Sequence, residues 1–530
     1  MSENEKERRI RPGTVALGAL SGALAGFAAL AFAEAVAGLV RPQAGPVVAV
    51  GGAAIDRTPT PVKDWAIRHF GTDDKLVLQL GILAVLTLFA LLLGIAAPRF
   101  RRTAALGALL FGVVGAAAAT SRPDSRGVAD ALPSVVGAVV GAVVLYLLAG
   151  RLAPRPPATT EREAAPGDRD RRGFVITATA AALASAGAGA LGRSLGGAAG
   201  RDAVASRRAV MLPAPASPAA AVPRGAGLRI PGISPFTTPN GSFYRVDTAL
   251  VVPKVDATAW RLRIHGKGVA RPRTLTYDDL VRRELIERDI TLTCVSNEVG
   301  GPYVGNARWI GVRLADLLAE CGVRPPSRGG PADQLVARSV DGMTLGSPVE
   351  DVMDGRDALL AVGMNGEPLP FAHGFPVRMV VPGLYGFVSA CKWIEDIELT
   401  TFDAYDPYWV KRGWARRAPV KTQSRIDTPK PFARPSAGTV MVAGVAWVQH
   451  RGIDKVEVRV DDGPWREARL AAEDSRDTWR QWSLPWEAAK GSHTLTVRAT
   501  DRTGRLQTDR RTRTVPDGAS GWHSVVMTVD

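Results

Sequence analysis

Five long apolar stretches in the first 200 residues restrict this chain more than any other feature of its sequence. A helix needs about 20 predominantly apolar residues to cross a bilayer. The stretch LVLQLGILAVLTLFALLLGIAA meets this requirement without a charge, whereas the third and fifth stretches are rich in Ala and Gly and give a weaker signal. We therefore predict an N-terminal all-α transmembrane bundle over 1–195. Its helices are expected at about 13–40, 76–97, 103–120, 134–150 and 174–195.

Basic residues occupy alternate loops between these stretches. KERRIRPG precedes the first, PRFRR joins the second to the third, and RLAPRP and GDRDRRG lie between the fourth and fifth. Short basic loops stay in the cytoplasm, so we expect a multi-pass protein of the plasma membrane with a cytoplasmic N-terminus. The residues after 200 are then extracytoplasmic. The same pattern accounts for much of the net charge of +15, so the sequence does not favour a nucleic-acid partner.

The predicted spans carry few polar side chains. None contains a histidine, because His69 lies in a loop, and an intramembrane haem needs axial ligands, so no haem is expected. Glu34 is more typical of a helix-end or interhelical contact than of a proton relay. A transporter with an outer sensory domain is therefore a weaker alternative than a membrane anchor.

The fifth stretch opens on a pattern typical of a twin-arginine export signal, DRRGFV at 170–175. Ordinary positive-inside charge is the alternative interpretation. The twin-arginine pathway exports folded domains, and a domain that folds in the cytoplasm usually does so to acquire a cofactor there. The pattern thus predicts a cofactor site in the remainder of the chain, and it leaves open whether the segment is cleaved.

The rest of the chain divides into three parts. Residues 196–232 are rich in Pro, Ala and Gly without periodicity, which predicts a flexible linker. In 233–415, the strand patterns WRLRIHG and DITLTCV alternate with the helix patterns TYDDLVRRE, which follows a Thr cap, and VRLADLLAECG, so we expect an α+β domain. In 420–530, period-2 strands such as HTLTVRATDRTGR are separated by Asp/Gly turns, which predicts an immunoglobulin-like β-sandwich.

Cysteine usage is sparse. The only cysteines are Cys294, Cys321 and Cys391, which excludes a disulfide framework and a CxxCH haem attachment. Cys294 follows a strand-like run and precedes a polar turn, so it is either a small buried hydrophobe or a ligand aimed into a pocket. Cys321 lies on the apolar face of ADLLAEC and is expected in the core. Cys391 is not expected to bind a metal, although its backbone could touch a bound cofactor.

Several motifs in order over about 300 residues resemble the sulfite oxidase family of molybdopterin-dependent oxidoreductases, of a membrane-anchored bacterial type with a C-terminal dimerisation domain. The motifs are LTCVSNEVGG, VGNARWIGVRLADLL, MNGEPLPFAHGFPVRMVVPGLYG, CKWIEDIEL and GVAWVQHRGIDKVEVRVDDGPW. In that family one cysteine thiolate binds molybdenum beside the dithiolene of a single pyranopterin, and the resemblance places Cys294 in this role. A thiolate is a soft ligand that suits such a metal.

The resemblance also implies the residues that bind the pterin and the substrate. The pterin ends in a phosphate, which requires cations and backbone donors. The cofactor-binding residues implied are Tyr244, Arg245, Cys294, His373, Arg378, Ser389 and Lys392. Arg308, in NARW, matches an arginine of the family's anion site and is expected to orient the substrate in catalysis.

Two departures from the family pattern bear on the substrate. Glu298 stands where sulfite oxidases continue into arginines, and Val362 and Gly363 occupy the place of a substrate-site tyrosine. A sulfate-sized dianion therefore fits less well than a neutral or cationic sulfoxide or N-oxide. The alternatives are a sulfite dehydrogenase proper and a cofactor-free binding or scaffold protein that retains the fold.

The expected activity is oxygen-atom transfer to or from a small substrate on the outer face of the membrane. The chain shows no cytochrome b5 module, so electrons are expected to pass to or from a separate electron-transfer protein or the quinone pool. The C-terminal sandwich is compatible with a homodimer. The direction of catalysis and the role of the first four helices stay open.

Overall fold

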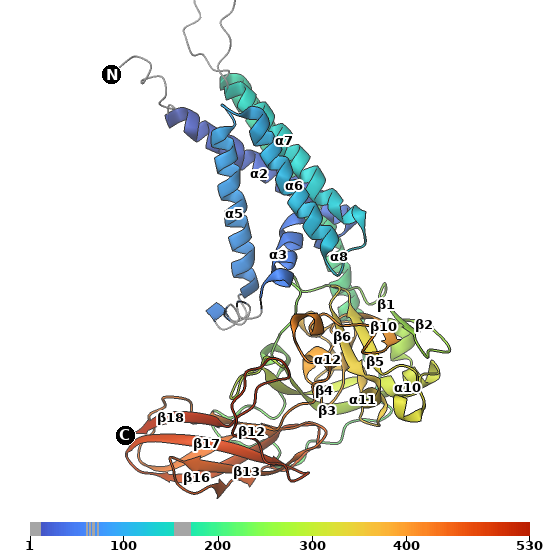
Figure 1. The fold of residues 1–530 in the computed structure, drawn as a ribbon, viewed down its shortest axis with the longest axis vertical. Coiled ribbons are helices and arrows are strands. Elements are labelled where there is room, and N and C mark those ends of the chain that lie inside the picture. Colours follow the sequence, from blue (N-terminus) through green and yellow to red (C-terminus); the bar gives the residue numbers. More distant parts are fainter. Residues whose placement is uncertain (1–11, 60–61, 63–64, 66–68, 71–73, 153–170) are drawn as a thin grey trace, which may run out of the picture. The chain divides into compact units, whose positions relative to one another are not determined.

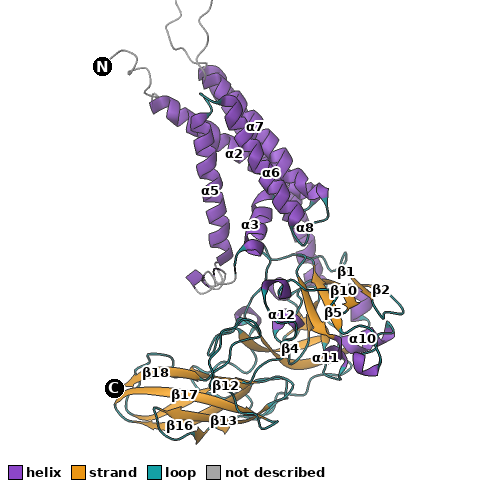
Figure 2. Cartoon of the chain, viewed as in Figure 1, coloured by secondary structure: helices purple, strands orange, loops and turns teal. Residues whose placement is uncertain are grey.

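The computed structural model forms two compact units, and each is described here by itself. The first contains residues 1–202 with 248–252, and the second contains 203–247 with 253–530. Helices make up the first unit and strands dominate the second (Figures 1 and 2). The structure describes residues 12–59, 62, 65, 69–70, 74–152 and 171–530. The basic residues of KERR and GDRD, and most of the loop stretch VKDWAIRHF, lie outside the described residues.

The helical unit follows the apolar stretches closely. Five helices among the described residues are long and apolar enough to cross a membrane, judged by length and composition. The α-helices are α2 (Pro12–Val40), α3 (Pro46–Arg57), α5 (Asp74–Ala96), α6 (Arg101–Ser121), α7 (Leu132–Leu152) and α8 (Arg171–Ala209). The sequence did not predict α3. It begins at Pro46, a residue that suits the first turn of a helix because its missing N–H would have no partner there.

A buried cluster of charges ties together the segments after α2 and α6. Arg41 donates to Asp124 at 2.7 Å and to Asp130 at 2.6 Å, and Arg122 donates to Asp124 at 2.7 Å. Asp130 also accepts the backbone N–H of Arg126. Asp130 is 1% exposed and Arg41 is 9% exposed, so water screens neither charge.

Removing one carboxylate from this cluster is expected to destabilise the helical unit. In Asp130→Asn, Arg41 keeps Asp124 but becomes an incompletely compensated buried charge, and breaking such a pair costs about 3–5 kcal/mol. The loss is measured by denaturing the detergent-solubilised protein while its helix content is followed. Asp202→Asn, at an exposed position, is the control and should unfold like the wild type. Equal stability of both variants would contradict the structural role of Asp130.

The segment predicted to be a flexible linker is ordered in two ways, which corrects that prediction. Helix α8 continues to Ala209, and the five alanines and three arginines of 196–209 favour the helix, although its three glycines do not. Beyond it, Ser217 pairs with Ile286 in a parallel bridge, and its carbonyl accepts the N–H of Glu287 at 2.8 Å. Ala226 is fully buried. Residues 210–232 are thus part of the sheet-rich unit.

Two sheets form the α+β part of the second unit. One has the order β2-β1-β10-β5-β6, and the other has the order β3-β4-β7-β8 with β9 paired to β7. The strands are β1 (Arg261–Gly266), β2 (Arg273–Thr276), β3 (Leu285–Thr293), β4 (Val304–Arg313), β5 (Gln334–Ser339), β6 (Thr344–Pro348), β7 (Leu359–Met364), β8 (Glu367–Pro368), β9 (Arg378–Val380) and β10 (Ile394–Thr400). The α-helices are α9 (Tyr277–Val281), α10 (Leu314–Glu320), α11 (Val349–Met353) and α12 (Gly386–Ser389). The expected Thr cap is Thr276, which forms a capping box with Asp279.

Residues 423–529 form two four-stranded sheets, with the orders β11-β12-β16-β15 and β14-β13-β17-β18. Their strands are β11 (Gln423–Thr428), β12 (Gly438–Trp447), β13 (Ile453–Val460), β14 (Arg466–Glu467), β15 (Arg469–Leu470), β16 (Arg480–Ala488), β17 (Gly491–Asp501) and β18 (His523–Val529). One apolar core, which includes Val442, Val456 and Trp482, draws residues from both sheets. The period-2 strands are confirmed, and the immunoglobulin-like type stays a prediction.

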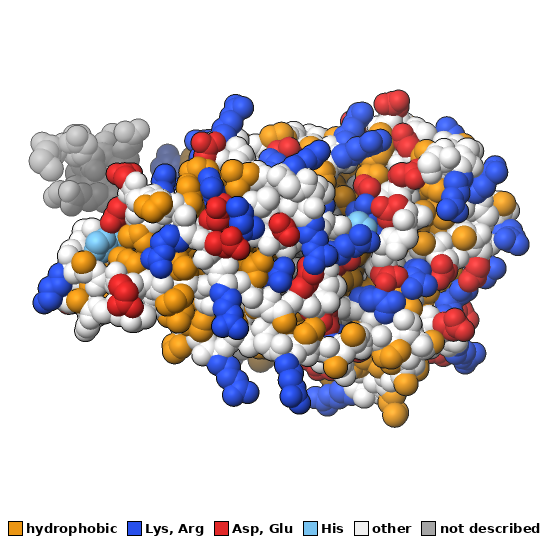
Figure 3. All heavy atoms as spheres, turned by 90° about the horizontal axis from the view of Figure 1, so that it is seen from below, with side chains coloured by type: hydrophobic (Ala, Val, Ile, Leu, Met, Phe, Trp, Pro, Cys, Tyr) orange, Lys and Arg blue, Asp and Glu red, His pale blue; other side chains and the backbone are white. Residues whose placement is uncertain are grey.

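The charge of the surface is mixed where it is seen in Figure 3. Lys and Arg side chains are spread over the face shown, with Asp and Glu side chains between them. This face shows no continuous patch of basic side chains of the kind that a nucleic-acid groove requires.

Candidate functional site

Cys294 lies where β3 ends, at the start of a closed loop. Its N–H donates to the carbonyl of Tyr303 at 2.9 Å, and its carbonyl accepts the N–H of Asn297 at 3.0 Å. Asn297 in turn accepts the N–H of Tyr303 through its side-chain oxygen at 2.8 Å. These three hydrogen bonds give the loop 294–303 a defined shape, and they hold the thiol, 7% exposed, at a single position.

The surroundings of Cys294 act on its charge in opposite directions. Burial raises the pKa of the thiol, while a hydrogen bond from Ser296 and the charge of Lys392 lower it. The Ser296 N–H lies 3.4 Å from the sulfur. A metal ion would shift this balance further towards the thiolate, because metals bind cysteine only in its deprotonated form.

Arg378, the first residue of β9, is a buried cation without a carboxylate partner among the described residues. It is 5% exposed, its Nη1 donates to the carbonyl of His373 at 3.2 Å, and its guanidinium lies 4.9 Å from the Trp309 ring. Its Nε has no hydrogen-bond partner in the part of the chain that the structure describes. Burial lowers the pKa of Arg378 to about 10. A buried guanidinium in this state calls for an anion, since an unpaired buried charge is costly.

His373 is held in a neutral form beside this cation. Its Nε2 donates to the carbonyl of Asn240 at 3.0 Å, and its ring packs edge-on against Phe243. Burial, together with the nearby charges of Arg378, Lys392 and Arg245, lowers the pKa of His373 to about 4. Arg245 itself is exposed. The structure thus places His373, Arg378 and Arg245 within electrostatic reach of one another, and their binding of a cofactor stays a prediction.

This histidine makes the fold sensitive to acid. The unfolded chain binds a proton at His373 near pH 6.5 and the folded chain only near pH 4, so the unfolded state binds more protons between these values. Stability therefore falls as the pH falls, by about 2 kcal/mol from pH 7 to pH 5. We expect the cofactor-free wild type to lose about 2 kcal/mol more over this range than His373→Gln in denaturant titrations, because His523, whose pKa burial also lowers to about 4, contributes equally to both proteins. Equal pH dependence of the two proteins would contradict the assignment.

Tyr244 lies close to both the Cys294 thiol and Arg378. Burial raises the pKa of its phenol, the charge of Cys294 adds to this, and the charge of Arg378 opposes it. The Tyr244 ring stacks on Phe243 and meets Tyr303 edge-on. Tyr244 is therefore a neighbour of both Cys294 and Arg378.

Lys392 is close to Cys294, whereas the Ser389 side chain takes part in a local turn. Lys392 lies close enough to Cys294 to act on its charge, and its ammonium pairs with Asp247 at 2.8 Å. The Ser389 hydroxyl donates to the carbonyls of Leu384 and Tyr385, so its side chain completes the local turn and is not directed at a ligand.

Arg308 lies outside this site, which corrects its predicted role. It pairs with Asp289, its cross-strand neighbour, through bonds of 3.1 and 2.6 Å. Successive side chains on a strand point to opposite faces of the sheet, so the Arg308 side chain points to the face opposite that of Trp309. The Trp309 ring is the one that the Arg378 guanidinium contacts. Hydrogen bonding to Asp289 raises the pKa of Arg308, and the charge of Asp289 compensates that of Arg308.

Several site residues were not predicted from the sequence. Tyr303 and Tyr385 lie near Cys294, Trp309 carries Arg378, and Asp247 pairs with Lys392. The C-terminal sheets also reach the loop 294–303, where the His523 ring lies so close to Gly300 that a Cβ there would be 2.2 Å from it. The sequence shows aromatic residues after the predicted strands, but aromatic residues of an ordinary hydrophobic core occur in the same positions, so this signal does not identify a site.

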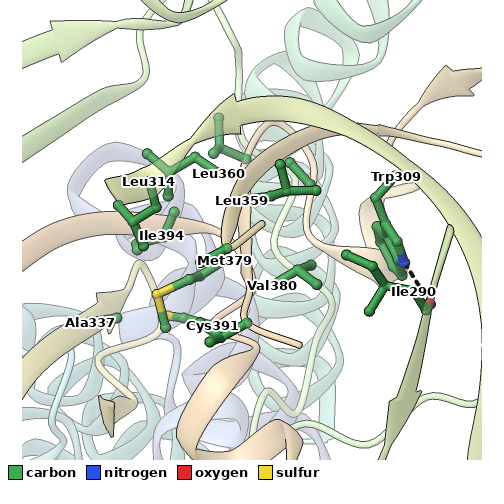
Figure 4. Close-up of a cluster of buried hydrophobic side chains, with 14 of the residues drawn as sticks. Ile290, Trp309, Leu314, Ala337, Leu359, Leu360, Met379, Val380, Cys391 and Ile394 are labelled. Atoms are coloured by element: carbon green, nitrogen blue, oxygen red, sulfur yellow. Dashed lines mark hydrogen bonds between the residues drawn. The ribbon is translucent and has the colours of Figure 1, made fainter. Parts of the chain in front are cut away.

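The other two cysteines have the structural roles that the sequence predicts. Cys321 is fully buried. Cys391 is also fully buried and lies beside Met379 among aliphatic side chains, as Figure 4 shows. Its carbonyl accepts the N–H of Met379 at 2.8 Å, so its backbone belongs to the core. In the same view the Trp309 indole donates to the carbonyl of Ile290 at 3.1 Å.

Comparisons with known proteins give a consistent result. The model of the oxidoreductase molybdopterin binding domain matches residues 249–409. Mitochondrial sulfite oxidase of Mus musculus is 30% identical over 317 residues, which cover 52% of this chain and 58% of the mouse protein. The uncharacterized oxidoreductase YuiH of Bacillus subtilis is 32% identical over 189 residues, which cover 36% of this chain and 87% of YuiH.

One solved structure is also similar. The sulfane dehydrogenase SoxCD from Paracoccus pantotrophus matches with 26% identity and a TM-score of 0.48, and the match covers 56% of this chain and 84% of that one. The chain spans between 53% and 58% of the lengths of the mammalian sulfite oxidases that it matches.

Proposed function

Because this chain belongs to the sulfite oxidase family of molybdopterin-dependent oxidoreductases, we propose that it is a membrane-anchored enzyme that transfers an oxygen atom to or from a small, uncharged substrate. One observation carries the proposal: the Cys294 thiol and the cations Arg378 and Lys392 are all buried, both cations border Gly374, and Lys392 and Tyr244 are close enough to the thiol for their charges to interact. A thiolate and an anion-binding group side by side suit a metal joined to a phosphate-bearing cofactor.

The residues present fit a molybdenum-pterin cofactor. Cys294 would hold the metal, and Arg378, whose Nε has no partner, would take the phosphate with the help of Lys392. When bound, the metal supplies oxygen-atom transfer and the accompanying two-electron change. The protein keeps water out with Tyr244, Tyr303 and Tyr385 and keeps His373 neutral, so that His373 presents a polar ring beside Arg378 without a further charge.

Three positions support an uncharged substrate. Glu298, which follows the loop asparagine, is exposed and negative, and Val362 is fully buried without a hydroxyl to offer. Arg308, the arginine expected to bind an anion, is paired with Asp289. These groups leave Arg245 as the exposed cation near His373, which is less than a sulfate-sized dianion needs for its two charges.

A sulfite dehydrogenase is the second candidate. The similarity to mammalian sulfite oxidases and the exposed guanidinium of Arg245 favour it. The two candidates differ in substrate charge and share the site around Cys294.

Activity measurements separate the candidates. Detergent-purified protein from a host that makes the cofactor is assayed with dimethyl sulfoxide and trimethylamine N-oxide, using reduced methyl viologen, and with sulfite, using ferricyanide. We expect viologen oxidation with the uncharged oxo-acceptors and little sulfite oxidation. Faster sulfite oxidation would establish the second candidate. No turnover of any of the three by fully loaded protein would contradict both.

The membrane location completes the proposal. Five apolar helices support a multi-pass anchor, and the basic loops support a cytoplasmic N-terminus with the sheet-rich unit outside. The arginine pair Arg171 and Arg172 supports export through the twin-arginine pathway, which suits a domain that is loaded with cofactor before export.

A further inference from the structure

Two side chains of the C-terminal sheets contact the loop that carries Cys294. Arg425 of β11 is 8% exposed, and its Nη1 donates to the carbonyl of Gly301 at 2.8 Å. His523, the first residue of β18, packs its ring on Gly300. Two adjacent residues of the loop 294–303 are therefore held from strands that lie far away along the chain.

The Arg425 guanidinium bonds through all three of its nitrogens. Besides Gly301, it donates from Nε to Asp427 at 2.7 Å and from Nη2 to the Ser234 hydroxyl at 2.9 Å. Asp427 also accepts the N–H of Ser234 at 2.9 Å. Because a guanidinium is planar and rigid, these bonds fix the Gly301 carbonyl relative to β11.

Stability alone does not explain this buried ion pair. Arg425 and Asp427 both lose their hydration, and apolar residues of similar volume often stabilise a core as well as such a pair does. An apolar side chain could not, however, give the Gly301 carbonyl a directed hydrogen bond. The pair therefore points to control over the position of the loop.

His523 restrains the loop by contact. Its Nδ1 accepts the N–H of Ile426 at 3.0 Å, so the proton of the neutral ring is on Nε2. Burial, with the charges of Arg425 and Arg511, lowers the pKa of His523 to about 4, which keeps the ring neutral at pH 7. A Cβ at Gly300 would overlap Cδ2 and Nε2 of this ring. The loop therefore has no room to move towards β18 at this point.

Hydrogen bonds inside the loop connect these contacts with Cys294. The Gly301 N–H donates to the carbonyl of Glu298 at 2.8 Å, and a Cβ at Gly301 would lie 2.7 Å from the side-chain oxygen of Asn297. That oxygen accepts the N–H of Tyr303. A shift at Gly301 therefore reaches both residues that are hydrogen-bonded to the backbone of Cys294.

We propose that Arg425 and His523 are positioning residues, which fix the Cys294 thiol for the metal by holding Gly301 and Gly300. They act through the loop, so the C-terminal sheets shape the metal site. The use of this restraint rests on the proposed function, since only a bound metal requires the thiol at one position. The restraint itself is present without the metal and can be measured without it.

The restraint is tested with Arg425→Met/Asp427→Asn, which removes the ion pair without leaving an unpaired carboxylate. Full-length, cofactor-free protein in detergent is treated with iodoacetamide, and the labelling rate of each cysteine is read by mass spectrometry. Labelling of a buried thiol requires local opening, so we expect Cys294 to react at least about tenfold faster than in the wild type. Cys321 and Cys391, both fully buried, should keep their rates.

The matched control is Arg498→Met/Glu457→Gln. It removes another ion pair of the C-terminal sheets, with a separation of 2.9 Å, and leaves the contacts of Gly300 and Gly301 in place. Its Cys294 should react within about twofold of the wild-type rate. An unchanged Cys294 rate in Arg425→Met/Asp427→Asn would overturn the proposal. So would an equal rise at all three cysteines, because the pair would then serve global stability alone.

A spectroscopic signature separates positioning from stability in the loaded protein. Per bound molybdenum, Arg425→Met/Asp427→Asn should shift the visible band that a thiolate–metal bond produces, and the control should not. Gly300→Ala should also shift the band, and adding His523→Ala should partly reverse that shift, because it removes the ring that the new Cβ meets.

Bands that stay unchanged in both Arg425→Met/Asp427→Asn and Gly300→Ala would overturn the positioning role. Wild-type protein that holds no molybdenum, from a host that makes the cofactor, would refute the proposed function instead. The labelling rates would in that case still decide whether the C-terminal sheets restrain the loop.

Discussion

Replacing Cys294 by alanine is expected to remove most of the bound molybdenum, together with the visible absorption that a thiolate bonded to this metal produces. The loop 294–303 holds one thiol at the end of β3, and the charge of this thiol acts on Tyr244 while that of Lys392 acts on the thiol, whereas Cys391 is fully buried in the core. A soft metal loses its protein ligand in this variant, because the oxygen donors nearby are poor substitutes. Metal analysis and visible spectroscopy of purified protein measure the effect.

The control for this experiment is Cys321→Ala. Cys321 is fully buried after α10, so the variant removes a thiol of equal size from the core and makes a small cavity. It should lose some stability and keep both its molybdenum and its visible spectrum. Wild-type molybdenum content in Cys294→Ala would show that Cys294 is not the ligand.

Replacing Arg378 by methionine is expected to have opposite effects on stability and on cofactor retention. In the cofactor-free protein Arg378 is a buried cation with an unpaired Nε, so an apolar side chain of similar length should raise the free energy of unfolding, by about 1–4 kcal/mol. In the loaded protein the same change removes the phosphate partner, so bound pterin should fall sharply.

Both halves of this prediction are measurable on the same preparations. Denaturant unfolding of cofactor-free protein gives the stability, and fluorescence of the released, oxidised pterin gives the retention. Arg313→Met is the control, because Arg313 pairs with Asp357 at 2.8 Å away from the site, so its loss should not change bound pterin. A stable variant that keeps its pterin would contradict the phosphate-binding role of Arg378.

The sequence predicted the apolar helices well, because hydrophobic length is a local property. Helix α2 begins and ends within one residue of its predicted stretch. The fifth helix runs 14 residues past its predicted end at 195, to Ala209, because an Ala-rich segment stays helical when it no longer contains large apolar side chains. Propensity and hydrophobicity separate at that point, and the prediction relied on hydrophobicity.

A site residue could be predicted from the sequence where it belongs to a recognisable motif. It could not be predicted where its role depends on which face of a sheet its side chain points to. The motifs named Cys294, His373 and Arg378, and in the structure Arg378 is close to His373 and shares the neighbour Tyr244 with Cys294. Arg308 and Trp309 are adjacent in the sequence, and which of them faces the site depends on the register of β3 with β4. Periodicity alone could not supply that register, because β4 is buried on both faces.

The contributions of distant segments were likewise invisible in the sequence. Asn240 orients His373 through its carbonyl, which any residue carries. His523 reaches Gly300 from the last strand, more than 200 residues away along the chain. Such contacts depend on how the sheets pack against one another, and neither the composition nor the local sequence pattern predicts that packing.

The most direct test of the account is the amount of molybdenum and pterin per polypeptide in the wild-type protein, purified in detergent from a host that makes the cofactor. We expect about one molybdenum atom and one pterin per chain, bound at Cys294 and Arg378. Well-folded protein from such a host that contains neither would contradict the enzyme and favour a binding or scaffold protein that retains the fold.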